Sequence, residues 1–143
     1  MRKRLERQDA IKRIVRNQRV KTQRALVEHL KAGGFVCTQA TVSRDITEMG
    51  LKKLPEGVYV LAEDLHLQRM VSDLVNDVKR SEKFVLVKAS AGTAPGVAAA
   101  LDAAEIDGIL GSVAGDDTIL VITVSEEDAA LLVDTLDKFR GVN

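Results

Sequence analysis

Residues 38–50 read Thr-Gln-Ala-Thr-Val-Ser-Arg-Asp-Ile-Thr-Glu-Met-Gly, and this stretch decides the fold of the first half of the chain. It predicts a helix over residues 39–49, because Thr38 can cap its start and Gly50 can end it. On a helical wheel, Val42, Ile46 and Met49 lie within about 60° of one another and form the side that packs inward. The opposite side is polar and presents Ala40, Thr41, Ser43, Arg44 and Thr47, with Gln39 at its flank near the N-terminus; we call these six residues the recognition face.

The composition of the recognition face suits contact with duplex DNA. Small residues allow close approach to a groove, hydroxyl groups suit phosphates or base edges, and an arginine such as Arg44 suits guanine or phosphate. The alternative is a polar helix face that only contacts water. The charge of the surrounding sequence favours DNA.

Two further helices are expected before residue 38. Thr22 can cap the second of them, and Gly33 and Gly34 supply residues that tolerate positive φ and end it. The apolar residues that fit one face of the first helix are Leu5, Ile11, Ile14 and Val15.

A β-hairpin is expected after Gly50, since residues 51–54 and 58–61 are β-prone and flank a Pro-Glu-Gly turn. Three helices followed by a hairpin predict a winged helix-turn-helix domain over residues 1–62. Lys52 and Lys53 would then lie on the wing beside the recognition face. Their side chains either contact the DNA backbone or only add solubilising charge.

The charge of the chain is divided between its halves. Of its 143 residues, the first 62 include fourteen Lys or Arg and six Asp or Glu, a net charge of +8. The remaining residues include seven Lys or Arg and fifteen Asp or Glu, a net charge of −8. This asymmetry indicates a nucleic-acid-binding module joined to a domain with a different task. Aromatic residues make up only 3% and Trp is absent, which argues against single-stranded ligands bound by base stacking.

The acidic half is predicted to fold as an α+β domain of order αβαββα, with residues 63–68 as a linker and residues 69–143 as the domain. Its small size favours oligomerisation. The expected elements are a helix from Leu67 to Val78, a strand over 84–87, a helix over 95–104, strands over 109–113 and 118–124, and a helix over 126–139.

Two loops of this half are candidate binding sites. Residues 91–96 run from a strand into a helix, so their N–H groups and the helix dipole can hold a carboxylate or phosphate; without further evidence, Thr93 and Pro95 form only a helix cap. The second loop is the acidic turn, Gly115-Asp116-Asp117. Its two adjacent carboxylates suit a cationic ligand, although Asp is also common in ordinary turns.

Several functional classes have little support in the sequence. Cys37 is the only cysteine, and His29 and His66 stand apart from it and from each other, so no disulfide and no zinc site are expected. No apolar run reaches membrane-spanning length and no signal peptide is evident, which predicts a cytoplasmic protein. An enzyme that uses Asp116 and Asp117 as metal ligands or acid–base groups remains a weak alternative, because no nucleophile motif accompanies them. We therefore expect no enzyme, no metal and no cofactor.

Four segments together resemble the bacterial arginine repressor family, and the similarity covers nearly the whole chain. They are residues 38–45, Gly92-Thr93-Ala94, Leu101-Asp102 and residues 111–120, which include Gly-Asp-Asp-Thr-Ile-Leu. The resemblance implies a winged helix-turn-helix domain that binds palindromic double-stranded operators of arginine-metabolism genes. The function that the resemblance implies is repression of biosynthesis genes, extended to activation of catabolic genes. It also implies a C-terminal domain that forms trimers and, by stacking two trimers, a hexamer.

The resemblance further implies that L-arginine is the corepressor and lies between the trimers. Asp116 and Asp117 match acidic residues that bind this ligand across subunits. Ser43 and Arg44 match residues of the DNA-contacting helix. The other positions that the resemblance assigns to the arginine site are Ala94, Asp102 and Thr118.

One position departs from the family pattern. Where family members often carry a ligand-binding Gln, this chain has Pro95, which has neither a side-chain hydrogen-bonding group nor a backbone N–H. An architectural DNA-binding oligomer that does not respond to arginine is therefore the alternative function.

Overall fold

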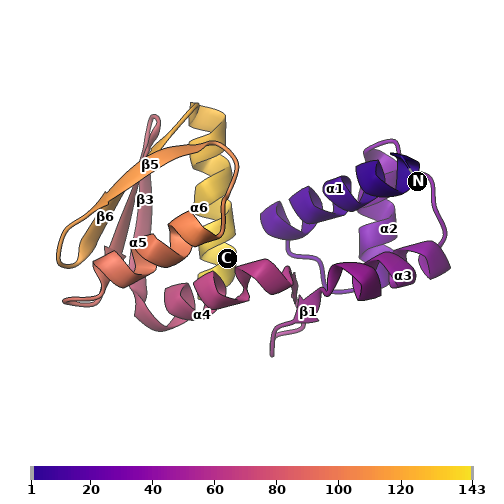
Figure 1. Ribbon diagram of the computed structural model, residues 1–143, viewed down its shortest axis with the longest axis horizontal. Helices are drawn as coiled ribbons and strands as arrows, with labels where there is room; N and C mark the ends of the chain where they lie inside the picture. The colour runs from indigo at the N-terminus through magenta and orange to yellow at the C-terminus, as the bar shows by residue number, and fades with distance from the viewer. Residues whose placement is uncertain (1, 143) are drawn as a thin grey trace. The chain divides into compact units, whose positions relative to one another are not determined.

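The computed structural model describes residues 2–142, which form two compact units (Figure 1). The first unit ends at Ala62 and the second begins at Glu63. In this part of the chain, no helix is both long enough and apolar enough to cross a membrane.

The first unit contains three helices and a short hairpin, as the sequence predicts. The hairpin strands are antiparallel, with Lys52 opposite Val60 and Lys53 opposite Tyr59. This arrangement is a winged helix-turn-helix. The elements are α1 (Arg2–Asn17), α2 (Gln23–Ala32), α3 (Gln39–Met49), β1 (Lys52–Lys53) and β2 (Tyr59–Val60).

The helix caps predicted for the first unit are confirmed. The Thr22 hydroxyl accepts a hydrogen bond from the N–H of Ala25 at 3.0 Å, and the Thr38 hydroxyl accepts one from the N–H of Thr41 at 3.2 Å. Gly50 ends α3 in the left-handed conformation, with φ of 67°, where a residue with a side chain would be strained. The sequence therefore sets both ends of α3.

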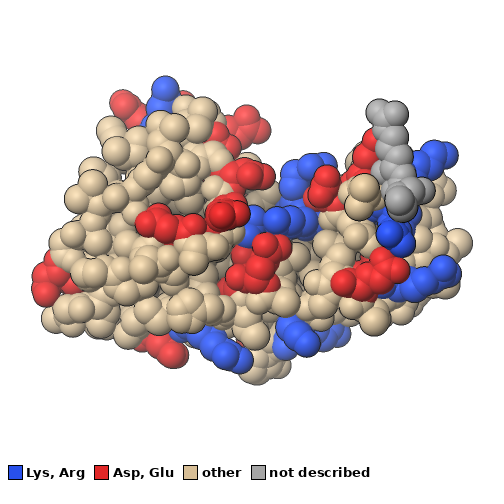
Figure 2. Space-filling model, viewed as in Figure 1, with Lys and Arg blue, Asp and Glu red and all other residues tan. Residues whose placement is uncertain are grey.

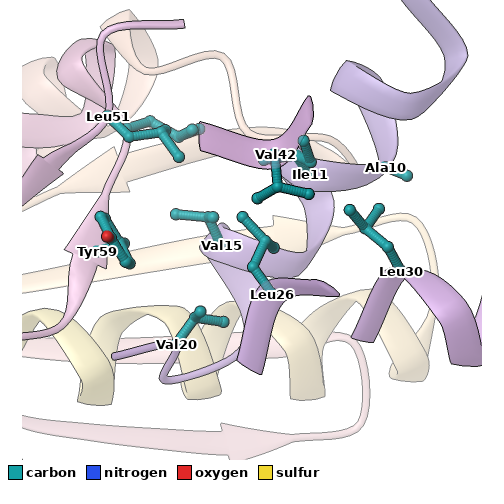
Figure 3. Packing of buried hydrophobic residues seen from close by; sticks show 10 residues of the cluster. Ala10, Ile11, Val15, Val20, Leu26, Leu30, Val42, Leu51 and Tyr59 are labelled. Carbon is teal, nitrogen blue, oxygen red and sulfur yellow. The ribbon is translucent and has the colours of Figure 1, made fainter. Parts of the chain in front are cut away.

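An apolar core holds the three helices and the hairpin together (Figure 3). Val42 of α3 is completely buried, and Ile46 and Met49 pack against the same core while remaining half-buried. The inward side of α3 is therefore the predicted one. Leu5 differs from expectation: it is 56% exposed and does not belong to the buried side of α1.

The second unit is a four-stranded antiparallel sheet with three α-helices. The spatial order of the strands is β3-β4-β6-β5. The elements, in chain order, are the 3-10 helix η1 (Ala62–Asp64), α4 (Leu65–Leu74), β3 (Val75–Ser81), β4 (Phe84–Ala89), α5 (Ala94–Ala103), β5 (Ile109–Ala114), β6 (Thr118–Thr123) and α6 (Glu126–Arg140).

The α+β class is confirmed, but the predicted order αβαββα is wrong, because a strand replaces the end of the first expected helix. Helix α4 ends at Leu74, and Val75 and Val78 lie in β3. The register of β3 shifts between Val75 and Asp77, so one extra residue places Val75 and Val78 on the same side of the sheet. Their spacing of three therefore imitates helical periodicity, and the true order is αββαββα. Residues 63–68, the expected linker, form most of η1 and the first turn of α4.

The sheet has one covered and one open side. Helices α5 and α6 contact β4 and β6, and along these strands Val85, Val87, Ile119 and Val121 are buried. The alternate residues point to the other side, where they remain exposed and apolar. These open-side residues include Phe84, Leu86, Val113 and Leu120.

Candidate functional site

The recognition face predicted from the sequence lies on the accessible side of α3. Gln39, Ala40, Arg44 and Thr47 are exposed, and Thr41 and Ser43 are half-exposed. Two hydroxyl groups already have partners within the unit: that of Thr41 lies 3.0 Å from the Thr38 hydroxyl, and that of Thr47 donates to the Ser43 carbonyl at 3.2 Å. The exposed guanidinium of Arg44 is therefore the strongest hydrogen-bond donor on this face.

The two lysines of the wing lie on β1, and both are exposed. The Nζ atom of Lys53 lies 5.0 Å from the centre of the Tyr59 ring, a cation–π distance. This contact holds Lys53 against β2 and gives it a role in the hairpin itself. Lys52 and Lys53 extend the positive charge of the first unit beyond the recognition face.

Charge is divided between the units in the structure as in the sequence. In the view of Figure 2, Lys and Arg are frequent over the first unit, whereas Asp and Glu predominate over the second. A polyanion is attracted to the first unit and repelled by the second.

Sequence reasoning missed Asp45, which lies on α3 but is only 1% exposed. Its Oδ1 atom accepts hydrogen bonds from Nη2 of Arg7 at 2.9 Å and from Nε2 of Gln8 at 3.0 Å, and its Oδ2 atom accepts one from Nε of Arg7. The available signal was the spacing on both helices: Arg4, Arg7 and Gln8 share a side of α1, and Asp45 shares a side of α3 with Glu48 three residues later.

These contacts shift two pKa values in opposite directions. Burial raises the pKa of Asp45, but the hydrogen bonds from Arg7 and Gln8 and the charge of Arg7 together hold it below its ordinary value. The hydrogen bond to Asp45 raises the pKa of Arg7. Both groups are therefore charged at neutral pH. Burial raises the pKa of the nearby Cys37 thiol, which favours the neutral, unreactive form.

In the second unit, the structure brings the two candidate loops together. The N–H of Ala94, at the start of α5, donates to the Asp116 carbonyl at 3.2 Å, and the N–H of Ala89 donates to the Asp117 carbonyl at 2.7 Å. Ala94 is fully buried, and its hydrogen bond places the start of α5 directly beside the acidic turn. Thr118 follows the turn at the start of β6.

Side chains beside the acidic turn fix one of its two carboxylates. The Thr118 hydroxyl donates to Oδ1 of Asp117 at 2.8 Å, and the Lys88 ammonium donates to the same hydroxyl at 2.8 Å. The ammonium also lies 3.9 Å from Oδ2 of Asp117. Lys88 comes from β4 and was not foreseen. Lys88 pairs with Asp117, and the exposed Asp116 adds a second carboxylate, so these three side chains together retain a net negative charge.

Three other residues of this half lie differently from the cap and site expectations. Thr93 occupies the N-cap position of α5 as expected, but its hydroxyl donates to the Ser90 carbonyl at 2.7 Å and makes no cap hydrogen bond. Pro95 lies in the first turn of α5 and is exposed. Asp102 is exposed near the other end of α5, eight residues after Ala94, which corresponds to about 12 Å along the helix. Asp102 is therefore separated from the acidic turn of its own chain.

A metal centre has no structural counterpart in the described residues. Within residues 2–142, no three His, Cys, Asp or Glu side chains gather in a way that could hold a metal ion.

Comparison with known families and proteins identifies both units. Residues 1–67 match the family model for the arginine repressor DNA-binding domain, and residues 71–138 match the model for the arginine repressor C-terminal domain. The chain belongs to the arginine repressor family. The resemblance drawn from the sequence motifs is thereby confirmed, and arginine repressors are DNA-binding regulators of transcription.

Individual arginine repressors are similar over most of their length. The arginine repressor of Thermus thermophilus is 45% identical over 148 aligned residues, which cover 96% of this chain and 88% of that protein. The one from Halothermothrix orenii is 43% identical, and the alignment covers 77% of this chain and 81% of that protein. The one from Carboxydothermus hydrogenoformans is 38% identical, and the alignment covers 94% of this chain and 97% of that protein.

Proposed function

We propose that this chain is an arginine-dependent transcription regulator that represses arginine biosynthesis genes and acts on catabolic genes as an activator. It binds palindromic operators in double-stranded DNA as a hexamer, in the cytoplasm, and has no catalytic activity. The observation that carries the proposal is the accessible recognition face of α3 within a family-matched, basic winged helix-turn-helix unit.

On the DNA side, α3 enters the major groove and the wing follows the backbone. Arg44 donates to base edges or phosphates, while Ala40 and Ser43 allow the helix to approach closely. Lys52 and Lys53 contact phosphates beside the groove. Several such phosphate contacts in each subunit make the binding strongly dependent on salt.

On the ligand side, the acidic turn binds the cationic groups of L-arginine. Asp116 and Asp117 form charge-assisted hydrogen bonds with its guanidinium or ammonium, and Thr118 holds Asp117 in place. Ala94 contributes the start of α5, where the helix dipole favours the ligand carboxylate. Asp102 lies too far along α5 to join this cluster, so we assign it to the ligand of a neighbouring subunit.

The open side of the sheet supports self-association. Pairing across three strands places Leu86 beside Leu120 and Leu120 beside Val113, so these apolar side chains form a continuous row. Phe84, Leu86 and Leu120 are each between 36% and 43% exposed, and Val113 is 67% exposed. A second copy of the chain is the natural cover for such a row. The resemblance specifies a trimer and then a pair of trimers.

Arginine binding and DNA binding are coupled through this assembly. Carboxylates of several subunits repel one another when they are brought together, and the bound cation removes that repulsion. A ligand that binds only the assembled form stabilises it. The assembly then presents paired recognition faces to a palindromic operator, which raises the affinity.

The second candidate function is an architectural DNA-binding oligomer without a ligand. Pro95 favours it, because the first turn of α5 lacks both an N–H and a side-chain partner for arginine at this position. DNA affinity that is the same with and without arginine would support this candidate.

The test is a mobility-shift titration at fixed salt with a palindromic operator duplex and a scrambled duplex, each with and without saturating L-arginine. We expect selective binding that arginine tightens. Asp117→Asn should reduce the arginine effect and leave nonspecific DNA binding intact, whereas the control Asp107→Asn, at another exposed acidic position, should change neither. Arg44→Ala should abolish selectivity without changing the oligomer. Equal loss of both activities in Asp117→Asn, or retained selectivity in Arg44→Ala, contradicts the assignment.

A further inference from the structure

Asp45 is a buried carboxylate on the helix that carries the recognition face. Its side chain is 2% exposed, and that of its partner Arg7 is 16% exposed. The planar guanidinium of Arg7 donates from two of its nitrogens to the two carboxylate oxygens, and Gln8 supplies a third hydrogen bond. Burial of a carboxylate without such partners would raise the free energy of the folded state. These bonds therefore fix how α3 packs against α1.

The contact continues one turn further along α3. The same amide nitrogen of Gln8 donates to Oε2 of Glu48 at 2.9 Å, and Nη1 of Arg4 lies 3.9 Å from Oε1 of Glu48. We call Arg7, Gln8, Asp45 and Glu48 the polar clamp. All its bonds connect α1 with α3, which are far apart in the sequence.

The polar clamp supplies directional contacts that the apolar side of α3 lacks. Val42, Ile46 and Met49 bind α3 to the core through contacts that depend on buried area and tolerate small rotations. On the helical wheel, Asp45 and Glu48 lie on one flank of this apolar side, between it and Arg44. A bidentate guanidinium–carboxylate pair at that flank permits only one rotation of the helix about its axis.

A small rotation of α3 is enough to disturb DNA recognition. Side chains reach about 5–6 Å from a helix axis, so a rotation of roughly 20° moves their outer atoms by about 2 Å. Hydrogen bonds to base edges require donor–acceptor distances of about 2.7–3.2 Å. Arg44 therefore contacts the intended bases only when the rotation of α3 is fixed.

We propose that Asp45 is a positioning residue for operator recognition: Arg7 and Gln8 hold its carboxylate, fix the rotation of α3 and thereby direct Arg44 to base edges. The proposal rests on the function proposed above, in which α3 contacts duplex DNA. The pairing also neutralises a carboxylate that would otherwise repel phosphates beside the recognition face.

The test uses Arg7→Lys in the full chain, because lysine keeps the charge but cannot form the two-nitrogen contact. The matched control is Arg13→Lys, the same exchange at an exposed position of α1. The probe is the palindromic duplex that the unaltered protein selects from a random pool with saturating L-arginine, together with its scrambled version at the same salt. We expect the ratio of the two affinities to fall about tenfold in Arg7→Lys. It should change less than about twofold in the control.

This ratio separates positioning from stability. Partial unfolding lowers the affinity for both duplexes by the same factor and leaves the ratio unchanged. Asp45→Asn provides a second variant, and the double variant Arg7→Lys with Asp45→Asn should lose no more selectivity than the more affected single variant. An unchanged ratio in both single variants, or a double-variant loss equal to the product of the single losses, overturns the proposal. If the unaltered protein selects no duplex, the proposed function itself is refuted.

Discussion

Gly108 offers a stringent test of the fold of the second unit. It precedes β5 with φ of +85°, and a Cβ atom at this position would lie 2.4 Å from Cγ and 2.5 Å from Oδ1 of Asp128. Gly141, just after α6, has a similar φ of +76° but open space around the corresponding position. We expect Gly108→Ala to destabilise the unit clearly more than Gly141→Ala, because only the first adds a steric clash to the backbone strain.

The magnitude follows from two contributions. A left-handed backbone costs a residue with a side chain about 1–2 kcal/mol, and this applies to both variants. In Gly108→Ala, Asp128 must also move, and rotation of its side chain is not sufficient because its Cβ atom lies at 2.8 Å. The movement disturbs the start of α6, where Ser125 Oγ donates to Asp128 Oδ2 at 2.8 Å and accepts from its N–H at 3.1 Å. Loss of such a cap costs about 1 kcal/mol, so we expect about 3 kcal/mol in total.

The assay is calorimetric unfolding of the full chain at one protein concentration without arginine, so that association contributes equally to each variant. In a domain of this size, 1 kcal/mol corresponds to roughly 4–8 °C in Tm. The unfolding temperature of the second unit should therefore fall at least about 4 °C further in Gly108→Ala than in Gly141→Ala. In an Asp128→Gly background, which lacks the obstructing side chain, Gly108→Ala should lower the unfolding temperature no more than Gly141→Ala does. Equal losses in the two single variants would refute the steric argument.

Three further predictions concern charge, assembly and ligand. Folding lowers the pKa of Asp45, so its pairing stabilises the protein above about pH 4, and this contribution disappears as the pH falls further. The difference in stability between the unaltered protein and Asp45→Asn should therefore shrink as the pH is lowered in acid denaturation. A difference that is independent of pH would contradict this. Leu120→Glu should weaken self-association, measured by sedimentation equilibrium, because it would bury a charge in the interface. Leu131→Glu, at a similarly exposed leucine of α6, should not weaken it. Equal effects of the two variants would count against the open side of the sheet as the interface. Pro95→Gln should raise the affinity for L-arginine about tenfold in titration calorimetry by adding a hydrogen-bonding group, and an unchanged affinity would remove Pro95 from the site.

The sequence predicted the first unit well, because its signals there are local. Caps at Thr22 and Thr38, the terminating Gly50 and the helical periodicity each act within a few residues. Two of the departures from the sequence predictions have identifiable causes. The bulge in β3 gave Val75 a spacing to the next buried valine that periodicity alone reads as helical. Leu5 lies about 180° from Ile14 on a wheel of 100° per residue, outside the buried side of α1, so its side chain faces solvent.

The candidate sites were only partly accessible to sequence reasoning, because their decisive contacts join distant segments. The recognition face lies on one helix, so a helical wheel was sufficient to place it. The bond between the Ala94 N–H and the Asp116 carbonyl, and the approach of Lys88 to Thr118, depend on strand order and register. The pairing of Asp45 likewise required knowledge of which side of α1 faces α3.

The two acidic sites of the chain show how burial separates a structural carboxylate from a binding one. Asp45 is enclosed and accepts three hydrogen bonds, so its charge is already compensated inside the protein. Asp116 and Asp117 are exposed, and the ammonium of Lys88 compensates only part of their charge across 3.9 Å, an arrangement that contributes at most about 1 kcal/mol. A guanidinium ligand can add bidentate hydrogen bonds here without first displacing a buried partner. The same residue type therefore orients a helix in the basic unit and remains free to bind a cation in the acidic one.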